Sequence, residues 1–588
     1  MHYLCRPYRR KPPRCATGGF PARLQKDGTA CKQHTAMKRK SLILPIAIFV
    51  LLCFTAFKKD NHNFQLSKQL NIFNTLIKEI DLFYVDTIAP EQMIKNGIDA
   101  MLEKLDPYTT YYTEEGSQEL KMMITGKYAG IGSLIRFHEK KNTTVIAEPY
   151  DDMPAAKAGL KIGDLIQSIN GVSVIGMSSD SVSNMLRGEA GTKLTIVVER
   201  PGEKKPVTIK LERESIALPS IPYYGMLGDS IGYLQLESFT DGCSKDMRRA
   251  FIDMKSKGAQ SYIIDLRSNG GGSMGEAIEI VNMFVPKGVK ILETKGKTKR
   301  SNETYKTTRE PIDTVSPIVV LVDGLTASAA EIVSGALQDL DRAVIIGSRT
   351  YGKGLVQTTR ELPYNSYLKV TTSKYYIPSG RCVQAIDYSH KNPDGSVARI
   401  PDSLTNVFHT VAGREVRDGG GIQPDIEPKS EKLTTLLYHL TQDMAIFDYA
   451  TEYKLKNATI APAESFCISD EDYEAFKSYL KASGFSYDKE SYKALKQLKK
   501  MLDLEGYTEA TKPEIEKLEK ALQHNLDHDL TFFAKDVKRF INDEIIKRYY
   551  SQKGCIVHAM RDDNDIAEGC KLLNNIEKYR EVLSPKKK

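Results

Sequence analysis

The sequence predicts a multidomain α/β and β protein with helical regions at both ends of its central domains. Short strand-like runs alternate with turn residues over residues 119–214. Strand-like and helical runs alternate over residues 215–428, which indicates parallel strands joined by right-handed crossovers. Apolar residues recur at helical spacing over residues 62–118 and again over residues 429–588. The 588 residues suffice for several domains, because single cores rarely exceed about 250 residues.

The positive charge of the chain is concentrated at its N-terminus. Of the formal net charge of +8, residues 1–36 carry +7 and Lys38, Arg39 and Lys40 carry +3, which leaves −2 for the rest. A nucleic-acid-binding domain would show a basic patch on its folded part. We therefore expect no nucleic-acid partner.

An uncharged, mostly apolar run, residues 42–57, follows this basic stretch. A basic start before an apolar run is typical of a secretory signal or of an uncleaved membrane anchor. Because a signal peptide begins at the N-terminus of its own chain, we interpret residues 1–36 as a misassigned leader, Met37 as the true start and residues 37–58 as the signal peptide or anchor. The positive-inside rule then places the remaining chain in the cell envelope, periplasmic or extracytoplasmic, either secreted or anchored in the inner membrane.

The cysteines give no indication of a metal or cofactor. The five that follow the apolar run are scattered, without a CxxC pair or the spacing of a metal site. Buried or free thiols are the favoured interpretation, and we expect neither a metal nor a cofactor. Cys555 and Cys570 form the one pair close enough in sequence to suggest a disulfide.

The β-rich segment, residues 119–214, resembles a PDZ domain. The resemblance rests on "YAGIG", "MPAAKAGLKIGDLIQSINGVSV" and "LRGEAGTKLTIVVER", which occur in this order. PDZ domains bind a terminal carboxylate with backbone N–H groups of a glycine-containing loop, while the peptide adds a strand to the sheet edge. The resemblance implies that Gly130, Ile131 and Gly132 form this loop. Taken alone, these glycines could simply turn the chain.

Two serines in the α/β segment are candidate nucleophiles. Ser273 stands in "GGSMG", the G-x-S-x-G pattern of an α/β-hydrolase elbow. That reading requires a downstream acid and histidine at strand ends, which are not recognisable, and the run of three glycines suits anion binding by backbone N–H groups better.

Ser328 in "TASAAEI" can be read as a helix cap, because Glu331 follows three residues later. It can also be read as a nucleophile after the strand "PIVVLVDG". One helix and one strand later comes Lys353 in "TYGKG", at the same end of the predicted sheet. A buried lysine can be neutral and act as a general base. Gln357 could hold its amine by a hydrogen bond, whereas Lys353 alone could be a surface residue in a glycine turn.

Together, "DLRSNGGG", "TASAAEI" and "TYGKGLVQ" resemble the carboxyl-terminal processing, or tail-specific, proteases. The resemblance covers roughly residues 70–430 and also rests on "LDPYTTYY", "YYIPSGRCVQ" and "GGGIQPDI". It implies that Ser328 is the nucleophile, Lys353 its base and Gln357 a supporting residue. It further implies an oxyanion hole formed by Gly271, Gly272 and Ala329, and, by fold-level analogy, a crotonase/Clp-protease-like α/β core with an inserted or preceding PDZ domain.

The expected function is that of a serine endopeptidase which binds the C-terminal tails of envelope proteins through its PDZ domain and cleaves them through an acyl-enzyme. The family resemblance implies that peptide binding can gate the active site through Arg187, which could equally be a solvated turn residue. The need for an adaptor protein, homo-oligomer formation and membrane anchoring by residues 42–57 stay open. The alternative is a non-catalytic PDZ scaffold, which the intact serine, lysine and glutamine disfavour.

Overall fold

The computed structural model describes residues 40–388, 397–429, 434–487, 490–522 and 526–585. The chain divides into two compact units, Met1–Asn96 and Gly97–Lys588. The predicted leader, residues 1–36, and the proposed start Met37 lie outside the described residues.

The first unit contains the long helix α1 (Lys40–Phe83) and the start of α2 (Pro90–Glu103). Within the described part of the chain, no helix combines the length and the apolar character that a membrane crossing requires. The predicted inner-membrane anchor over residues 42–57 is therefore wrong. The physical reason is length, since this run is shorter than the about 20 apolar residues that span a bilayer.

A six-stranded antiparallel sheet forms the centre of the predicted PDZ segment. Its strand order is β3-β4-β5-β7-β8, with β6 paired to β5, so that β3 (Ser133–His138) is an edge strand. A separate pair, β2 (Lys127–Gly130) with β9 (Glu214–Ala217), closes the segment. The other elements are β4 (Thr143–Pro149), β5 (Leu165–Ile169), β6 (Val172–Ser173), β7 (Lys193–Glu199), β8 (Val207–Glu212), η1 (Glu139–Lys141), α4 (Pro154–Lys157) and α5 (Ser179–Leu186).

The predicted α/β core contains a five-stranded sheet of order β10-β11-β12-β15-β16, in which all pairs except β10–β11 are parallel. The predicted parallel pairing is thereby confirmed. The other four strands are almost entirely buried, because helices cover both faces of the sheet, whereas the edge strand β10 is partly exposed. The bounds are β10 (Tyr223–Leu227), β11 (Ile231–Gln235), β12 (Ser261–Asp265), β15 (Ile318–Val322), β16 (Val344–Gly347), α6 (Cys243–Ser256), α7 (Met274–Val281) and α8 (Ala329–Asp339).

A second sheet of the core includes a strand from before the PDZ segment. Strand β1 (Thr110–Tyr112) pairs with β18 (Ser366–Tyr376), so the PDZ segment is inserted into the core. Of the two arrangements left open by the sequence, the structure shows the inserted one. The remaining elements of this region are α3 (Ser117–Thr125), β13 (Lys290–Gly296), η2 (Lys299–Ser301), β14 (Glu303–Lys306), β17 (Leu355–Leu362), η3 (Asp402–Leu404), β19 (Val407–His409) and β20 (Glu415–Arg417).

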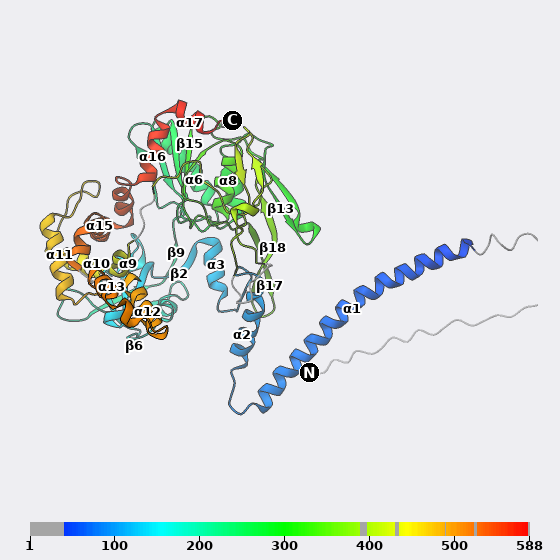
Figure 1. The fold of residues 1–588 in the computed structure, drawn as a ribbon, viewed down its shortest axis with the longest axis horizontal. Helices are drawn as coiled ribbons and strands as arrows, with labels where there is room; N and C mark the ends of the chain where they lie inside the picture. The colour runs from blue at the N-terminus through cyan, green and yellow to red at the C-terminus, as the bar shows by residue number, and fades with distance from the viewer. Residues whose placement is uncertain (1–39, 389–396, 430–433, 488–489, 523–525, 586–588) are drawn as a thin grey trace, which may run out of the picture. The chain divides into compact units, whose positions relative to one another are not determined.

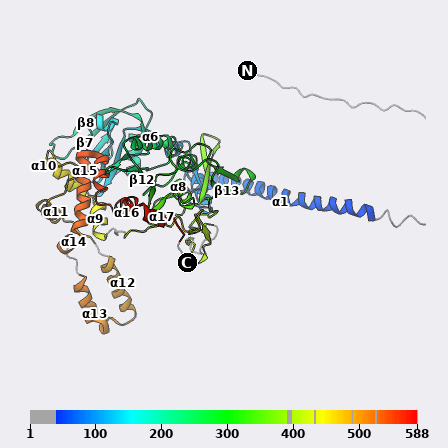
Figure 2. The same ribbon diagram turned by 90° about the horizontal axis from the view of Figure 1, so that it is seen from above.

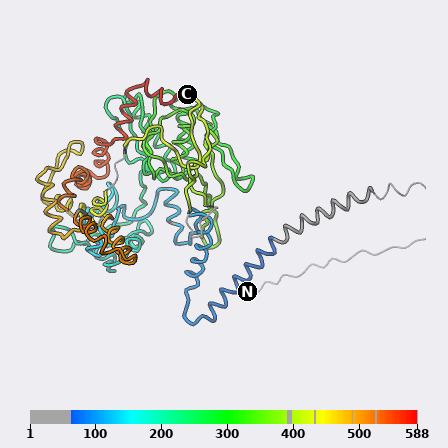
Figure 3. The backbone as a smooth tube through the Cα atoms, viewed as in Figure 1, coloured from blue at the N-terminus to red at the C-terminus, as the bar shows by residue number. Residues whose placement is uncertain are grey.

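The C-terminal helices form a bundle and then return to the core. The bundle has its own apolar core and also contacts the PDZ segment, where Phe447 packs with Val145 and Leu165. Helices α12 and α13 project from it as a hairpin (Figure 2). The last two helices lie beside the core sheet (Figures 1 and 3). The bounds are α9 (Thr435–Gln442), α10 (Ala445–Lys456), α11 (Asp470–Ala482), α12 (Glu490–Leu504), α13 (Thr508–Ala521), α14 (Leu526–Phe532), α15 (Ala534–Ala559), α16 (Asn564–Leu573) and α17 (Ile576–Val582).

The disulfide suggested by the spacing of Cys555 and Cys570 is absent, because both thiols are free. Cys555 packs against the core of the helical bundle, whereas Cys570 packs with α16 against the core sheet. Closeness in sequence therefore did not bring the two side chains together.

Candidate active site

Three loops that carry the sequence motifs leave the same edge of the parallel sheet. Strand β12 leads into "DLRSNGGG", β15 leads to Ser328 and β16 leads to Lys353. These strands are adjacent and parallel, in the order β12-β15-β16. The carboxyl ends of parallel strands are where α/β sheets place their ligand sites.

Ser328 has a strained backbone conformation at the start of α8. Its φ and ψ are 56° and −115°, values that a residue other than glycine rarely adopts. Such a turn between a strand and a helix is the geometry of a nucleophile elbow. Helix α8 is buried along its entire length, so the surrounding core holds this turn in place.

Glu331 connects the Ser328 turn with the Lys353 loop. Its fully buried carboxylate accepts hydrogen bonds from the N–H groups of Ser328 (2.9 Å), Gly352 (2.8 Å) and Lys353 (2.8 Å), and from the Thr350 hydroxyl (2.6 Å). Burial raises the pKa of Glu331, and these four donors act against that shift. The residue expected to secure the helix start thus also determines how the two motif loops lie together.

Tyr375 joins the same two loops from the second sheet. Its hydroxyl donates to the carbonyl oxygens of Ser328 (3.3 Å) and Lys353 (3.0 Å). The side chain is buried and belongs to β18. Glu331 therefore binds N–H groups of both loops, and Tyr375 binds a carbonyl group of each.

Lys353 is held under an aromatic ring and has a lowered pKa. Its Nζ lies 4.4 Å from the centre of the Tyr108 ring. Burial is the main cause that lowers the pKa of Lys353 to about 8, and the charge of Lys369 lowers it further, whereas Glu331 and Asp106 act to raise it. A pKa near neutrality makes the free amine available as a general base.

Gln357 takes part in a hydrogen-bonded chain on β17 and β18. Its Nε2 donates to the Thr371 hydroxyl (3.1 Å), and the Thr371 N–H donates to the Thr109 hydroxyl (3.2 Å). Thr109 in turn donates to the buried Asp106 carboxylate (3.1 Å). This chain fixes the orientation of the Gln357 amide through the segment that precedes the PDZ insertion.

The predicted oxyanion glycines differ in what their N–H groups do. The Gly271 N–H donates to the Asn269 side chain (2.9 Å), so it is already occupied. Within the described residues, the N–H groups of Gly272 and Ala329 have no acceptor. Gly271 instead allows close approach, because a Cβ at this position would lie 2.7 Å from Ser328 Cβ and 3.0 Å from the Ala329 nitrogen.

Ser273, the alternative nucleophile, is the N-cap of α7. Its φ and ψ of −67° and 119° are relaxed, and its hydroxyl accepts a hydrogen bond from the Glu276 N–H (3.4 Å). The strained elbow that the G-x-S-x-G pattern suggested for Ser273 therefore occurs at Ser328.

The predicted carboxylate-binding loop joins β2 to the edge strand β3. Gly132 has a φ of 69°, and Ile131 is buried in the PDZ core, which limits its contribution to its backbone. Arg187 stacks on the Tyr128 ring, with its Cζ 5.5 Å from the ring centre, and Tyr128 lies against Gly130. The predicted gating arginine thus lies next to this loop.

Sequence reasoning did not assign roles to Tyr108, Tyr375 or Lys369. Tyr108 stands in "LDPYTTYY", which contributed to the family resemblance without a role for its residues. The contacts of Tyr375 and Lys369 depend on the pairing of β18 with β1 and β17, which no local pattern shows. Over the described ranges, no group of His, Cys, Asp and Glu side chains is arranged as a metal site.

Three family models match successive parts of the chain. "Peptidase family S41" matches residues 230–397, and "PDZ domain" matches residues 145–200. "Probable PDZ-protease, C-terminal helical domain" matches residues 436–573. Along the chain, the matches correspond in turn to the insertion, the core and the helical bundle described above.

Two bacterial relatives each match about two thirds of the chain. The chain is 35% identical over 389 residues to a carboxy-terminal-processing protease of Bartonella bacilliformis, covering 65% of this chain and 88% of that protein. It is 30% identical over 399 residues to a probable CtpA-like serine protease of Staphylococcus saprophyticus, covering 67% and 77% of the two chains. Among solved structures, the photosystem II D1 C-terminal processing protease is 27% identical, with a TM-score of 0.32 and coverage of 53% of this chain and 89% of that chain. By these sequence relationships, the chain belongs to the S41 family of carboxy-terminal-processing proteases and is a serine-type peptidase with a PDZ domain.

Proposed function

We propose that the protein cleaves substrates near their free C-terminal tails with Ser328 as nucleophile and Lys353 as general base. The observation that carries this proposal is the strained Ser328 turn, whose N–H shares the Glu331 carboxylate with the N–H of Lys353. Strain of this kind costs about 1–3 kcal/mol and persists where the surrounding structure enforces it, typically at functional sites.

In the proposed mechanism, the neutral amine of Lys353 takes the proton of the Ser328 hydroxyl as its Oγ attacks the scissile carbonyl carbon. The N–H groups of Gly272 and Ala329 stabilise the oxyanion, and Ala329 opens α8, where the helix dipole favours negative charge. The Lys353 ammonium then gives its proton to the leaving amine, and an ester to Ser328 remains. Lys353 next activates a water, which hydrolyses the ester and frees the serine.

Two neighbouring residues support the base in this mechanism. Tyr108 covers the amine and keeps water away from it, which favours the neutral form before the reaction. Gln357, whose amide is held by Thr371, is proposed to support the lysine from β17 through its side-chain oxygen.

The PDZ domain is proposed to capture the substrate tail. Edge strand β3 can accept an additional strand, and the loop of Gly130, Ile131 and Gly132 at its start can bind the terminal carboxylate. Arg187 lies beside this loop, stacked on the Tyr128 ring. A bound terminal carboxylate would attract the Arg187 guanidinium and so change its contact with that ring. This is the physical basis that we propose for gating.

The decisive experiment compares three alanine variants of the purified chain on a protein substrate with an apolar C-terminal tail. We expect Ser328→Ala and Lys353→Ala to abolish cleavage. Ser273→Ala should remain active, because a lost N-cap costs only about 1 kcal/mol of stability. Full activity of Ser328→Ala would refute the assignment, and selective loss in Ser273→Ala would move the nucleophile to α7. Tail binding without cleavage by the wild-type protein would favour the scaffold alternative.

A further inference from the structure

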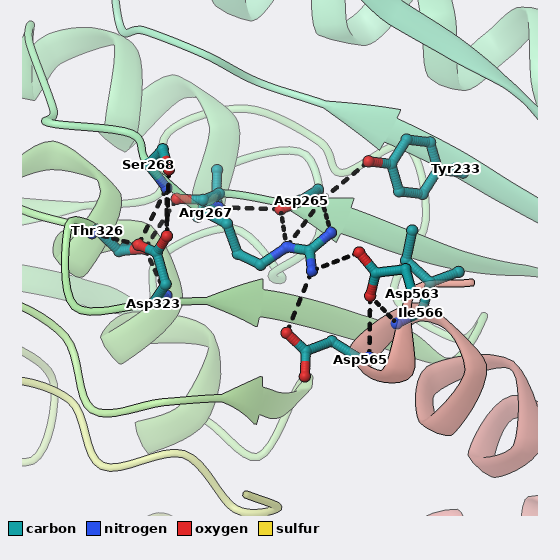
Figure 4. Close-up of polar contacts among 10 residues, drawn as sticks. Tyr233, Asp265, Arg267, Ser268, Asp323, Thr326, Asp563, Asp565 and Ile566 are labelled. Atoms are coloured by element: carbon teal, nitrogen blue, oxygen red, sulfur yellow. Dashed lines mark hydrogen bonds and ion pairs between the residues drawn. The ribbon is translucent and has the colours of Figure 1, made fainter. Parts of the chain in front are cut away.

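The loop that holds the oxyanion glycines is tied to the C-terminal helices by a cluster of charges. Arg267, in "DLRSNGGG", donates through Nε and Nη2 to the Asp265 carboxylate (3.0 and 2.6 Å) and through Nη1 to Asp563 (2.7 Å) and Asp565 (3.2 Å). Figure 4 shows the guanidinium between β12 on one side and the start of α16 on the other. Tyr233 completes the cluster by donating to Asp265 (2.8 Å).

The residue after Arg267 connects this cluster to the turn that carries Ser328. Ser268 has a φ of 60°, and its N–H donates to both oxygens of Asp323 (3.0 Å each). Asp323 also accepts from the Thr326 N–H (2.9 Å), two residues before the nucleophile. The Asn269 carbonyl accepts from the Ala327 N–H (2.9 Å). A displacement of Arg267 would therefore reach both the oxyanion loop and the Ser328 turn.

Helices α16 and α17 are firmly packed on the sheet from which these loops emerge. Ile566 and Leu572 are buried against Ile263 and Val319 of β12 and β15. The Tyr579 hydroxyl accepts from the Ile318 N–H and donates to the Ile318 carbonyl, both at 3.0 Å, at the start of β15. The start of α16 thus presents its carboxylates from a rigid support.

The charges of this cluster are not balanced. Three carboxylates surround one guanidinium, although Arg267–Asp265 alone already forms a bidentate pair. Asp563 is also the N-cap of α16, where its Oδ1 accepts from the N–H groups of Asp565 and Ile566. A cap needs no arginine, since an asparagine fulfils it equally well. Helix stability can explain carboxylates at the start of α16, but it does not require their contact with Arg267.

We infer that α16 is a positioning element of the active site, in which Asp563 and Asp565 act through Arg267 to hold the loop Asp265–Gly272 and the Ser328 turn in their reactive geometry. The inference deepens the proposed function and rests on it. It also explains why a helical domain that follows the catalytic core in sequence returns to that core: the last helices complete the support of the oxyanion loop.

The test uses the double variant Asp563→Asn/Asp565→Asn in the full-length chain. Asparagine keeps the N-cap and the side-chain volume while it removes both charges. A cavity of about 470 Å³ borders Arg267 and Asp563, so the exchange meets no crowding. Glu568→Gln is the matched control, because this carboxylate lies on the same helix but pairs with Lys571 (3.3 Å).

We expect kcat to fall about 10- to 100-fold in the double variant, since a misplacement of about 1 Å costs on the order of 100-fold, while KM stays close to the wild-type value. The affinity for a peptide boronate, whose tetrahedral adduct needs the oxyanion hole, should fall in parallel. In an Arg267→Gln background, the two aspartate substitutions should have no additional effect on kcat. Glu568→Gln should match the wild type.

Hydrogen exchange of the same variants separates failure of this inference from failure of the proposed function. The inference predicts faster exchange in residues 266–272 and 323–328 of the double variant and unchanged exchange in the PDZ segment. Unchanged kcat, a full additional effect in the Arg267→Gln background, or exchange that rises uniformly over the chain would overturn it. If cleavage proved independent of Ser328 while the local exchange rose as expected, the proposed function would fail, but the support of the loop Asp265–Gly272 by α16 through Arg267 would stand.

Discussion

The pH dependence of cleavage gives a quantitative test of Lys353 as the base. With a pKa of about 8, about a tenth of Lys353 is neutral at pH 7. With the ordinary value of 10.5, the neutral fraction at that pH would be about 300-fold smaller. Below pH 8, kcat/KM should therefore rise about tenfold per pH unit and then level off. Initial rates on a tailed peptide at constant ionic strength measure this profile.

The Tyr108→Ala variant perturbs the same quantity through its physical cause. Removing the ring lets water reach the amine, so the pKa of Lys353 should move back toward 10.5 and the acid limb should move to higher pH. Activity should fall strongly at pH 7 and recover at alkaline pH, a pattern that misfolding would not produce. Tyr364→Ala, at a tyrosine that is 93% exposed, is the control and should keep the wild-type profile.

Two outcomes would refute this reasoning. A wild-type profile with an acid limb near pH 6.5 would indicate a histidine base instead of a lysine. A fall in Tyr108→Ala that is equal at every pH would show that the ring affects something other than protonation of the amine.

Three further predictions follow from the same geometry. Gly271→Ala should abolish cleavage, because its Cβ would lie 2.8 Å from the Ala327 oxygen at a φ of 97°. Gly270→Ala is the control and should stay active, because the new methyl group meets open space. Equal activity of the two variants would contradict the close approach of Gly271 to the Ser328 turn. Glu331→Gln should reduce kcat by a factor on the order of 100 and lower Tm, since an amide NH₂ cannot accept from the N–H groups that the carboxylate binds. An unchanged Tm would show that Glu331 does not hold the Ser328 turn and the Lys353 loop together. Lys353→Met should be inactive but more stable than the wild type at pH 7, because the lowered pKa of Lys353 means that the folded state disfavours the ammonium. This gain in stability should shrink between pH 8 and 10.5, where the folded wild type loses the proton that the unfolded chain keeps. Thermal unfolding at several pH values measures it, and a gain that grew with pH would contradict the prediction.

Much of the fold could be predicted because its signals are local. The short apolar strands of the core alternate with helices, and this alternation implies parallel pairing whatever the rest of the chain does. The approach of Lys353 to Ser328 followed from counting one helix and one strand between them. Of the two readings of residues 42–57, the membrane anchor was wrong, because the basic flank and the low charge of the run allowed it although the run is short.

The sequence by itself determined the parallel core and the two loops that bear the candidate serine and lysine, since each depends on residues that are neighbours along the chain. That the PDZ segment is inserted into the core was decided by the pairing of β1 with β18. Only the tertiary structure decided which serine occupies the strained turn, which ring covers the lysine and which helix supports the oxyanion loop. Ser328, Tyr108, Arg267 and Asp563 come from segments up to hundreds of residues apart. Their contacts arise from strand pairing and helix packing, and the free energy of such long-range contacts is not expressed in any local pattern.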